Sequence, residues 1–174
     1  MNRLQNKVAF ITGAGSGIGQ GCAKMFAQEG AKIIVADFNE KWGSETVQTI
    51  NETGGDAVFV KCNVRIKDDI RDAVKKSVNK YGRIDILVNS AGILRLKPFL
   101  EITDDDYTAI TETNLRGYFW TMQEILPIMI KQGKGNIINI ASISAYKPET
   151  NSCIYAATKA GVAMMTQDVA KEMA

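Results

Sequence analysis

Tyr155 and Lys159 are the residues best suited to acid–base chemistry in this sequence of 174 residues. Residues four apart on a helix lie on the same face, so the lysine ammonium can sit beside the phenol and favour its ionised form. The sequence contains no histidine, which excludes Ser-His-Asp and Cys-His catalysis and the usual zinc sites. Tyr155 is therefore the best acid–base candidate, although the same spacing is also common on solvated helix faces.

A glycine-rich segment, Thr12–Gly19, follows the first apolar run of the chain. Gly13, Gly17 and Gly19 lack the Cβ atoms that would keep a pyrophosphate away from backbone N–H groups, and the helix that follows directs its positive end at the phosphates. The glycines follow a G-x-x-x-G-x-G pattern rather than G-x-G-x-x-G. A glycine-rich turn alone is weak evidence, but this position after a first strand predicts a dinucleotide-phosphate site.

Asp37 ends the second apolar run, 18 residues after Gly19. A carboxylate at this point can accept hydrogen bonds from both hydroxyls of an adenosine ribose and repels a 2′-phosphate. Neither Ser16 nor Phe38 is an arginine or lysine that would bind such a phosphate. The pattern favours NAD over NADP, and the alternative is that Asp37 only caps a helix.

Short apolar runs alternate along the chain with longer segments of helical period. The runs are rich in Val and Ile and lack polar alternation, which indicates strands buried on both faces of a parallel sheet. The predicted strands are Val8–Thr12, Lys32–Ala36, Ala57–Lys61, Ile84–Asn89 and Asn136–Ile140. The predicted helices are Gly17–Glu29, Glu40–Glu52, Lys67–Tyr81, Asp104–Lys131 and one that begins near Ser152. This alternation predicts an α/β fold with a right-handed, doubly wound parallel sheet.

Composition and charge limit the possible partners. The net charge is +2 with mixed signs, so nothing in the electrostatics favours nucleic acid or an anionic membrane. The longest apolar stretches, such as Ile125 to Ile130, have six residues, too few to span a membrane, and the N-terminus lacks a signal-peptide pattern. Cys22, Cys62 and Cys153 are widely spaced, which indicates core thiols in a reducing compartment rather than metal ligands. We therefore expect a cytoplasmic protein with no metal site.

Several motifs together resemble the short-chain dehydrogenase/reductase family, and the resemblance runs in order from residue 7 to 174. They are Thr12–Gly19, Asn89-Ser90-Ala91-Gly92, Asn114, Ser142, and Tyr155 with Lys159. The resemblance implies a Rossmann-type sheet with strand order 3-2-1-4-5. It also implies an NAD(H)-dependent oxidoreductase that interconverts a small-molecule secondary alcohol and a ketone.

The resemblance also implies roles for single residues. Tyr155 would be the general acid in carbonyl reduction and the base in alcohol oxidation, and Lys159 would hold the nicotinamide ribose and favour the phenolate. Ser142 would hydrogen-bond the substrate oxygen, and Asn114 would hold a water that links Lys159 to solvent. The expected cofactor-binding residues are Gly13, Ser16, Gly17, Ile18, Gly19, Asp37, Phe38, Asn63, Val64, Asn89, Ala91, Gly92, Tyr155 and Lys159.

The sequence departs from the family pattern at two positions and in length. Asn63 stands where an aspartate is usual, and its amide oxygen can still accept from the adenine amino group. Ser90 stands where a second asparagine is usual, which weakens a local backbone tie. Family members commonly have roughly 250 residues, so we expect residues 1–174 to form a single, C-terminally incomplete domain that lacks strands six and seven and the substrate lid.

Two further functions fit the same motifs. One is a 3-oxoacyl-carrier-protein reductase. Most of these enzymes look NADPH-dependent, and Asp37 argues against this function because its carboxylate would repel the 2′-phosphate of NADPH. The other is a non-catalytic dinucleotide-binding or regulatory module, against which the presence of Ser142 argues.

The last two helical segments also suggest an assembly, because they contain more apolar residues than one sheet face requires. In the resembling family these helices pair across a two-fold axis, so we expect a homo-oligomer, a tetramer or a dimer. The apolar residues concerned are Tyr118, Phe119, Trp120, Met122, Ile125, Val162, Met164 and Met165.

Overall fold

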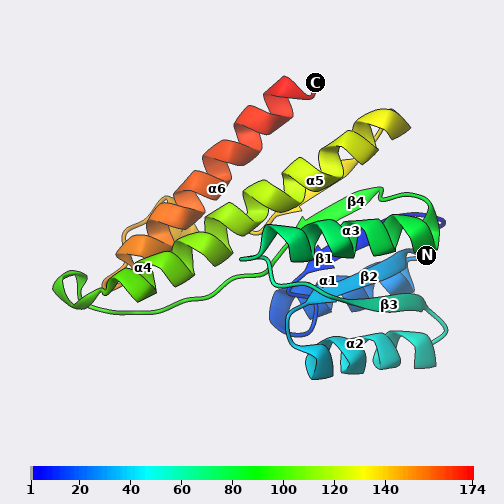
Figure 1. Cartoon of the computed structure of the whole chain (residues 1–174), viewed down its shortest axis with the longest axis horizontal. Coiled ribbons are helices and arrows are strands. Elements are labelled where there is room, and N and C mark those ends of the chain that lie inside the picture. The colour runs from blue at the N-terminus through cyan, green and yellow to red at the C-terminus, as the bar shows by residue number, and fades with distance from the viewer. Residues whose placement is uncertain (1) are drawn as a thin grey trace.

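The five apolar runs form one parallel sheet in the computed structural model, which describes residues 2–174 (Figure 1). The strands lie in the order β3-β2-β1-β4-β5, and every neighbouring pair is parallel. The predicted fold class and strand order are therefore confirmed. The strands are β1 (Val8–Thr12), β2 (Lys32–Asp37), β3 (Asp56–Lys61), β4 (Ile86–Asn89) and β5 (Asn136–Asn139).

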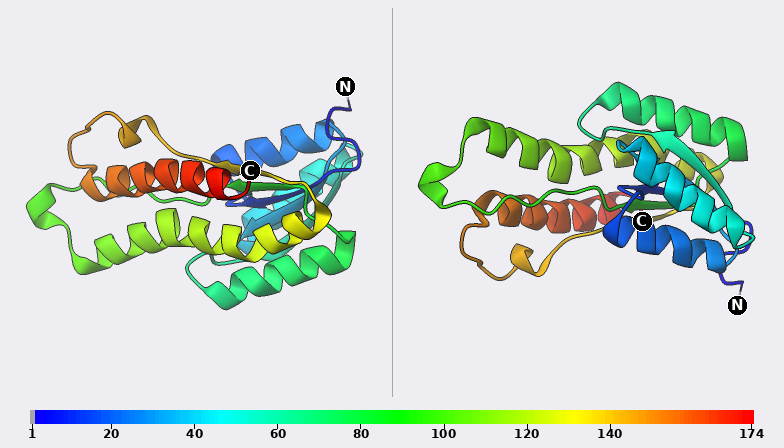
Figure 2. Two further views of the ribbon diagram at one scale, coloured as in Figure 1. Left: turned by 90° about the horizontal axis from the view of Figure 1, so that it is seen from above. Right: turned by 90° about the horizontal axis from the view of Figure 1, so that it is seen from below.

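Helices cover both faces of the sheet. Buried side chains of α1 and α2 pack against one face, and those of α3 and α5 pack against the other. The last helix, α6, runs alongside the α4–α5 segment (Figures 1 and 2). The helices are α1 (Gly17–Gln28), α2 (Glu40–Glu52), α3 (Lys67–Tyr81), α4 (Asp104–Thr111), α5 (Gly117–Gln132) and α6 (Cys153–Glu172).

The segment predicted as one helix, Asp104–Lys131, is helical throughout, but it is not a regular α-helix: a π-helical turn at Glu112–Arg116 divides it into α4 and α5. Asn114 lies in this turn, fully buried, and its side chain binds the backbone of Ile93. Its Oδ1 accepts from the Ile93 N–H and its Nδ2 donates to the Ile93 carbonyl, both at 2.8 Å. A π turn widens the helix by one residue, which accommodates this contact with the loop after β4.

The fourth strand begins two residues later than predicted. Ile84 lies outside the ladder because its backbone binds a side chain instead. The Ile84 N–H donates to Gln132 Oε1 at 3.1 Å, and its carbonyl accepts from Gln132 Nε2 at 2.9 Å. The amide at the end of α5 thus replaces the strand neighbour at this position.

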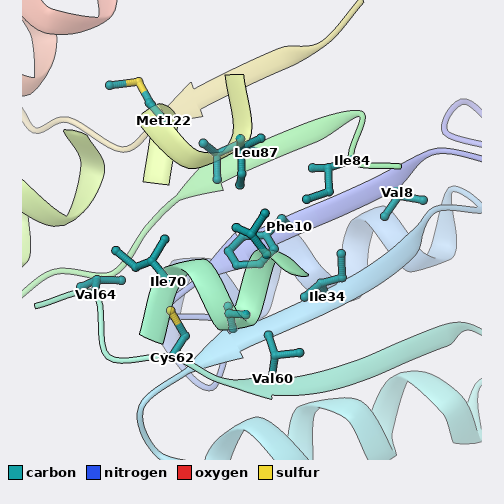
Figure 3. Packing of buried hydrophobic residues seen from close by; sticks show 14 of the residues in the cluster. Val8, Phe10, Ile34, Val60, Cys62, Val64, Ile70, Ile84, Leu87 and Met122 are labelled. Atoms are coloured by element: carbon teal, nitrogen blue, oxygen red, sulfur yellow. The ribbon is translucent and has the colours of Figure 1, made fainter. Parts of the chain in front are cut away.

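The core is divided between the two faces of the sheet. Figure 3 shows the cluster under α3 and α5, where Phe10, Ile34 and Leu87 of three neighbouring strands meet Ile70 and Met122 of the helices. Every residue of β1 and β4 is buried, as expected for a parallel sheet covered on both sides. In contrast, β5 alternates between exposed and half-buried residues, and Ile138 is 42% exposed.

The three cysteines occupy different environments. Cys62 is buried in the core, Cys22 is half-buried and Cys153 is exposed, so the prediction of a core thiol is wrong for Cys153. All three are free thiols. Within residues 2–174, none of the helices is both long and apolar enough to cross a membrane.

Candidate active site

The glycine-rich turn after β1 brings two segments of backbone into close contact. Gly13 has φ +64°, and a Cβ atom there would lie 2.8 Å from the Cα of Ala91 in the loop after β4. A Cβ on Gly19 would lie 2.3 Å from the Gly13 carbonyl oxygen. Both positions therefore require glycine, because larger residues would separate α1 from the turn and the turn from the loop after β4.

The first turn of α1 has the features of a phosphate site. Ser16 is its N-cap, and within residues 2–174 its hydroxyl makes no capping hydrogen bond. The turn Gly17–Gln20 contains no acidic side chain. The N–H groups at this end of α1 are therefore available to an anion, and the positive end of the helix dipole favours one.

Asp37 lies at the end of β2 with its carboxylate directed to the glycine turn. Its Oδ2 accepts from the Gly15 N–H and its Oδ1 accepts from the Asn39 N–H, both at 2.8 Å. The alternative that Asp37 caps α2 is wrong, because Asn39 is the N-cap and accepts from the Trp42 N–H. Each carboxylate oxygen retains acceptor capacity for a further hydrogen bond.

A pocket of about 610 Å³ opens at the carboxyl ends of β1–β4. It lies where the strand order reverses between β2 and β4, which is the usual ligand position in an open α/β sheet. Ten of the predicted cofactor residues line it: Gly13, Ser16, Gly17, Ile18, Asp37, Phe38, Asn63, Val64, Ala91 and Gly92.

Two of the predicted cofactor residues lie behind the pocket wall. Gly19 packs under the turn, and Asn89 is fully buried with its side chain bonded within the core. Asn89 Oδ1 accepts from Thr121 Oγ1 at 2.6 Å, and its Nδ2 donates to Asn139 Oδ1 at 2.9 Å. The Asn89 side chain thus connects β4 to α5 and β5 and is directed away from the pocket.

The two departures from the family pattern have defined local contacts. Thr12 Oγ1 accepts from the N–H groups of Ser90 and Ala91 at 3.1 and 3.2 Å, so the loop after β4 remains tied to β1. Asn63 Oδ1 accepts from the Arg65 N–H at 3.1 Å and closes a local turn. This leaves one lone pair of the Asn63 amide oxygen for a ligand.

Lys159, the cationic residue of the candidate catalytic set, is buried, with 3% of its surface exposed. Its Nζ donates to the Ile140 carbonyl at 2.6 Å and to the Tyr118 hydroxyl at 3.2 Å. The same Nζ lies 5.8 Å from the centroid of the Tyr155 ring. Burial lowers the pKa of Lys159 from 10.5 to about 8.

Asn114 and Gly92 connect this lysine to the pocket. A Cβ on Gly92 would lie 3.5 Å from Asn114 Oδ1 and 3.9 Å from Lys159 Nζ. Gly92 also lines the pocket. The structure thus brings the predicted residues Asn114, Tyr155 and Lys159 close together, beside the pocket residue Gly92.

Ser142 lies two residues after the carbonyl that holds Lys159 and caps a short 3₁₀ turn, η3 (Ile143–Ala145). Its Oγ accepts from the Ser144 N–H and donates to Ser144 Oγ, both at 3.1 Å. Ser144 in turn donates to Glu149 Oε2 at 2.8 Å. This chain fixes the Ser142 hydroxyl on the segment that leads into α6.

Sequence reasoning missed three polar residues near the site. Arg65 and Arg95 line the pocket and pair with Glu112 and Asp106, respectively. Tyr118 was counted only as an apolar helix residue, yet its hydroxyl contacts Lys159. No local motif marks these residues, because each contact joins two different elements or loops of the fold.

Comparison with known proteins assigns the class. The family model of the short chain dehydrogenases matches residues 7–174, and the chain belongs to this family. The chain is 41% identical over 172 residues to the 3-oxoacyl-(acyl-carrier-protein) reductase of Thermotoga maritima, covering 99% of this chain and 70% of that protein. The family predicted from the motifs is therefore confirmed.

Two solved structures match the fold closely. A putative short-chain dehydrogenase/reductase from Burkholderia xenovorans matches with TM-score 0.95 and 35% identity over 99% of this chain and 71% of that one. A 7α-hydroxysteroid dehydrogenase, solved with NADH and 7-oxo glycochenodeoxycholic acid, matches with TM-score 0.94 and 34% identity over 98% of this chain and 67% of that one. The chain is thus an oxidoreductase of a family that binds nicotinamide dinucleotides.

Proposed function

We propose that this protein is an NAD(H)-dependent oxidoreductase that interconverts a secondary alcohol and a ketone. The observation that carries the proposal is the continuity between the pocket and the acid–base residues. Gly92 lines the pocket and lies beside Lys159, whose ammonium lies near the Tyr155 ring. A dinucleotide held along the pocket would reach the acid–base residues.

The pocket residues fit the cofactor in their chemistry. The N–H groups at Ser16, Gly17 and Ile18 would bind the pyrophosphate, and Asp37 would accept from the adenosine ribose hydroxyls. Phe38, Asn63 and Val64 would contact the adenine, and Ala91 and Gly92 would allow close approach along the loop after β4. When bound, NAD(H) supplies the hydride acceptor or donor.

The protein's own residues would move the proton. Tyr155 would take the proton from the alcohol in oxidation and return it to the carbonyl oxygen in reduction. The nearby Lys159 ammonium would favour the phenolate and bind the nicotinamide ribose. Ser142 would orient the substrate oxygen. Asn114, whose side chain is held by the Ile93 backbone, would hold a water that links Lys159 to solvent.

Asp37 supports NAD rather than NADP, because a buried carboxylate at the ribose position repels a 2′-phosphate. The two arginines that line the pocket are already paired with Glu112 and Asp106. The identity to the Thermotoga reductase favours a second candidate function, reduction of a 3-oxoacyl thioester. The two candidates differ in substrate and in the expected cofactor, and they use the same catalytic set.

A direct assay tests the proposal. NAD⁺ reduction with a panel of secondary alcohols, and NADH oxidation with ketones and a 3-oxoacyl thioester, would be followed at the nicotinamide absorbance. Turnover that is faster with NAD(H) than with NADP(H) supports the proposal. Preference for the thioester with NADPH would favour the reductase, and cofactor binding without turnover on any substrate would favour a non-catalytic module.

The proposal also includes a location in a reducing, cytoplasmic compartment, which the three free thiols support. It further includes assembly into a homo-oligomer. Of the apolar residues predicted at the interface, Tyr118, Met122, Ile125 and Val162 are instead buried within the chain. Phe119 of α5 and Met164 of α6 remain 46% and 58% exposed. Light scattering at micromolar concentration should give a dimer or tetramer, and a monomer would contradict this part of the proposal.

A further inference from the structure

Tyr118 is the second phenol beside Lys159. It is the second residue of α5, and only 1% of its surface is exposed. Its hydroxyl lies 3.2 Å from Lys159 Nζ and donates to the Ile140 carbonyl oxygen at 3.3 Å. The phenol, the ammonium and the carbonyl therefore form a closed triangle between α5, α6 and the end of β5.

Two of the N–H donors of Lys159 are matched by the two oxygen acceptors of this triangle. A lysine ammonium has three N–H donors. The Ile140 carbonyl takes one at 2.6 Å and the Tyr118 oxygen takes another. Within residues 2–174 this leaves the third N–H for Tyr155 or a bound ribose. A phenylalanine at position 118 would fill the same space but would offer no acceptor to the ammonium.

The two phenols near Lys159 differ in their ability to ionise. Burial, and to a smaller extent the charge of an ionised Tyr155, raise the pKa of Tyr118 well above its usual range. Tyr118 therefore remains a neutral phenol at any pH at which the protein works. A neutral phenol stabilises the charged lysine by accepting a hydrogen bond and does not compete for the proton.

Other titratable groups on the elements around α6 are engaged elsewhere. Asp106 of α4 pairs with Arg95 and Lys97. Glu112 of the π turn pairs with Arg65 and Arg116. Tyr118 from α5 and Tyr155 from α6 itself are thus the titratable side chains that face Lys159, while the segment that directly follows β5 contributes the Ile140 carbonyl.

We propose that Tyr118 is a positioning residue that holds the Lys159 ammonium in place and keeps it charged for the reaction. This inference rests on the proposed function, in which the charged lysine assists Tyr155. It assigns to α5 a part in the catalytic set beyond the four residues of the sequence motif.

The test is a pH titration of Lys159 by NMR in protein labelled with ¹³C at lysine Cε, with the signal assigned by Lys159→Met. In Tyr118→Phe we expect the Lys159 midpoint to fall by about half to one pH unit, because the charged form loses a hydrogen bond. Tyr81→Phe is the matched control, since it removes a phenol that binds Asp56 away from the site. An unchanged midpoint in Tyr118→Phe, or an equal fall in Tyr81→Phe, would overturn the proposal.

A second measurement uses the unaltered protein and does not depend on the folding of a variant. With ¹³C at tyrosine Cζ, the Tyr118 signal should show an inflection at the same pH as Lys159, near 8. Absence of this inflection would also overturn the proposal. Both titrations need no substrate, so a protein that lacks alcohol turnover but shows the coupling would contradict the proposed function and leave the pairing of Tyr118 with Lys159 intact.

Discussion

The proposed cofactor pocket at the ends of β1–β4 and the proposed catalytic segment, which carries Ser142, Tyr155 and Lys159, are built in different ways. The pocket is formed by loops that follow fully or largely buried strands, and its shape comes mainly from backbone contacts such as Gly13 against Ala91. The catalytic segment follows β5, which is partly exposed, and its geometry comes from side-chain hydrogen bonds. Lys159, for example, is held by one carbonyl and one phenol.

This difference separates what the fold requires from what the proposed reaction requires. A pocket built from backbone is a property of the fold, so it should form whether or not the catalytic side chains are present. The proposed catalytic segment instead contains a buried cation, Lys159, which costs stability and which the proposed function explains by its chemistry. Substitutions in the pocket should therefore weaken cofactor binding or lower the stability of the fold, whereas removal of the buried cation should raise the stability and abolish turnover.

The largest expected effect is on turnover in Tyr155→Phe. Removing the hydroxyl should lower turnover by about a hundredfold or more, because the general acid–base group is lost. NADH affinity should stay within about twofold, since the pocket is formed by β1–β4. The control is Tyr107→Phe on α4, an exposed position that should keep full activity. Near-normal turnover in Tyr155→Phe would show that another group moves the proton.

The next effect is on stability, in Lys159→Met. Burial lowers the Lys159 pKa from 10.5 to about 8, so below pH 8 the folded protein holds a charged lysine at a cost of up to about 3 kcal/mol. The variant should therefore unfold at higher denaturant concentration at pH 7 while losing turnover.

The stability difference between Lys159→Met and the unaltered protein should depend on pH. Between pH 8 and 10.5 the lysine is neutral in the folded state and charged in the unfolded chain, so the free energy of unfolding of the unaltered protein should rise with pH. The advantage of Lys159→Met should thus shrink across this interval and vanish above it. Denaturant unfolding of both proteins at pH 7, 9 and 10.5 measures it, and a constant difference would contradict the account.

A smaller effect is expected in the glycine turn. Gly13→Ala should destabilise the protein by about 2 kcal/mol, because alanine is strained at φ +64° and its Cβ would contact Ala91. Gly21→Ala is the matched control: its Cβ meets open space within α1, and it should stabilise the helix by up to about 1 kcal/mol. Thermal unfolding compares the two, and equal shifts would show that the close contact has no energetic importance.

The smallest effect is on cofactor choice in Asp37→Asn. Loss of the charge should weaken NADH binding by about tenfold and reduce the discrimination against NADPH. Asp56→Asn at the opposite end of β3 is the control and should leave both affinities unchanged. An undiminished preference for NADH in Asp37→Asn would remove Asp37 from the explanation of specificity.

Much of the pocket could be predicted from the sequence because its signals are local. Buried strands appear as continuous runs of Val and Ile, and Gly13 and Asp37 lie directly at strand ends, so position along the chain gives position at the pocket. The family resemblance supplied the strand order, which the structure confirms.

The catalytic segment was less predictable because its contacts are long-range. The π turn around Asn114 depends on the hydrogen bonds that the Asn114 side chain makes with the backbone of Ile93, and this contact is not visible in the apolar pattern of the helix. The Asn89 side chain appeared as a pocket residue from its motif, yet its position between Thr121 and Asn139 depends on how β4, β5 and α5 pack. Tyr118 was predicted as an apolar residue because the sequence does not place Lys159 beside it.

The central claim is that the pocket at the ends of β1–β4 binds NAD(H) and uses Asp37 to exclude the 2′-phosphate of NADP(H). Titration of the unaltered protein with NADH and with NADPH, followed by nicotinamide fluorescence at the same ionic strength, tests it most directly. We predict a dissociation constant for NADH at least about tenfold lower than for NADPH. Equal binding, or tighter binding of NADPH, would contradict the account.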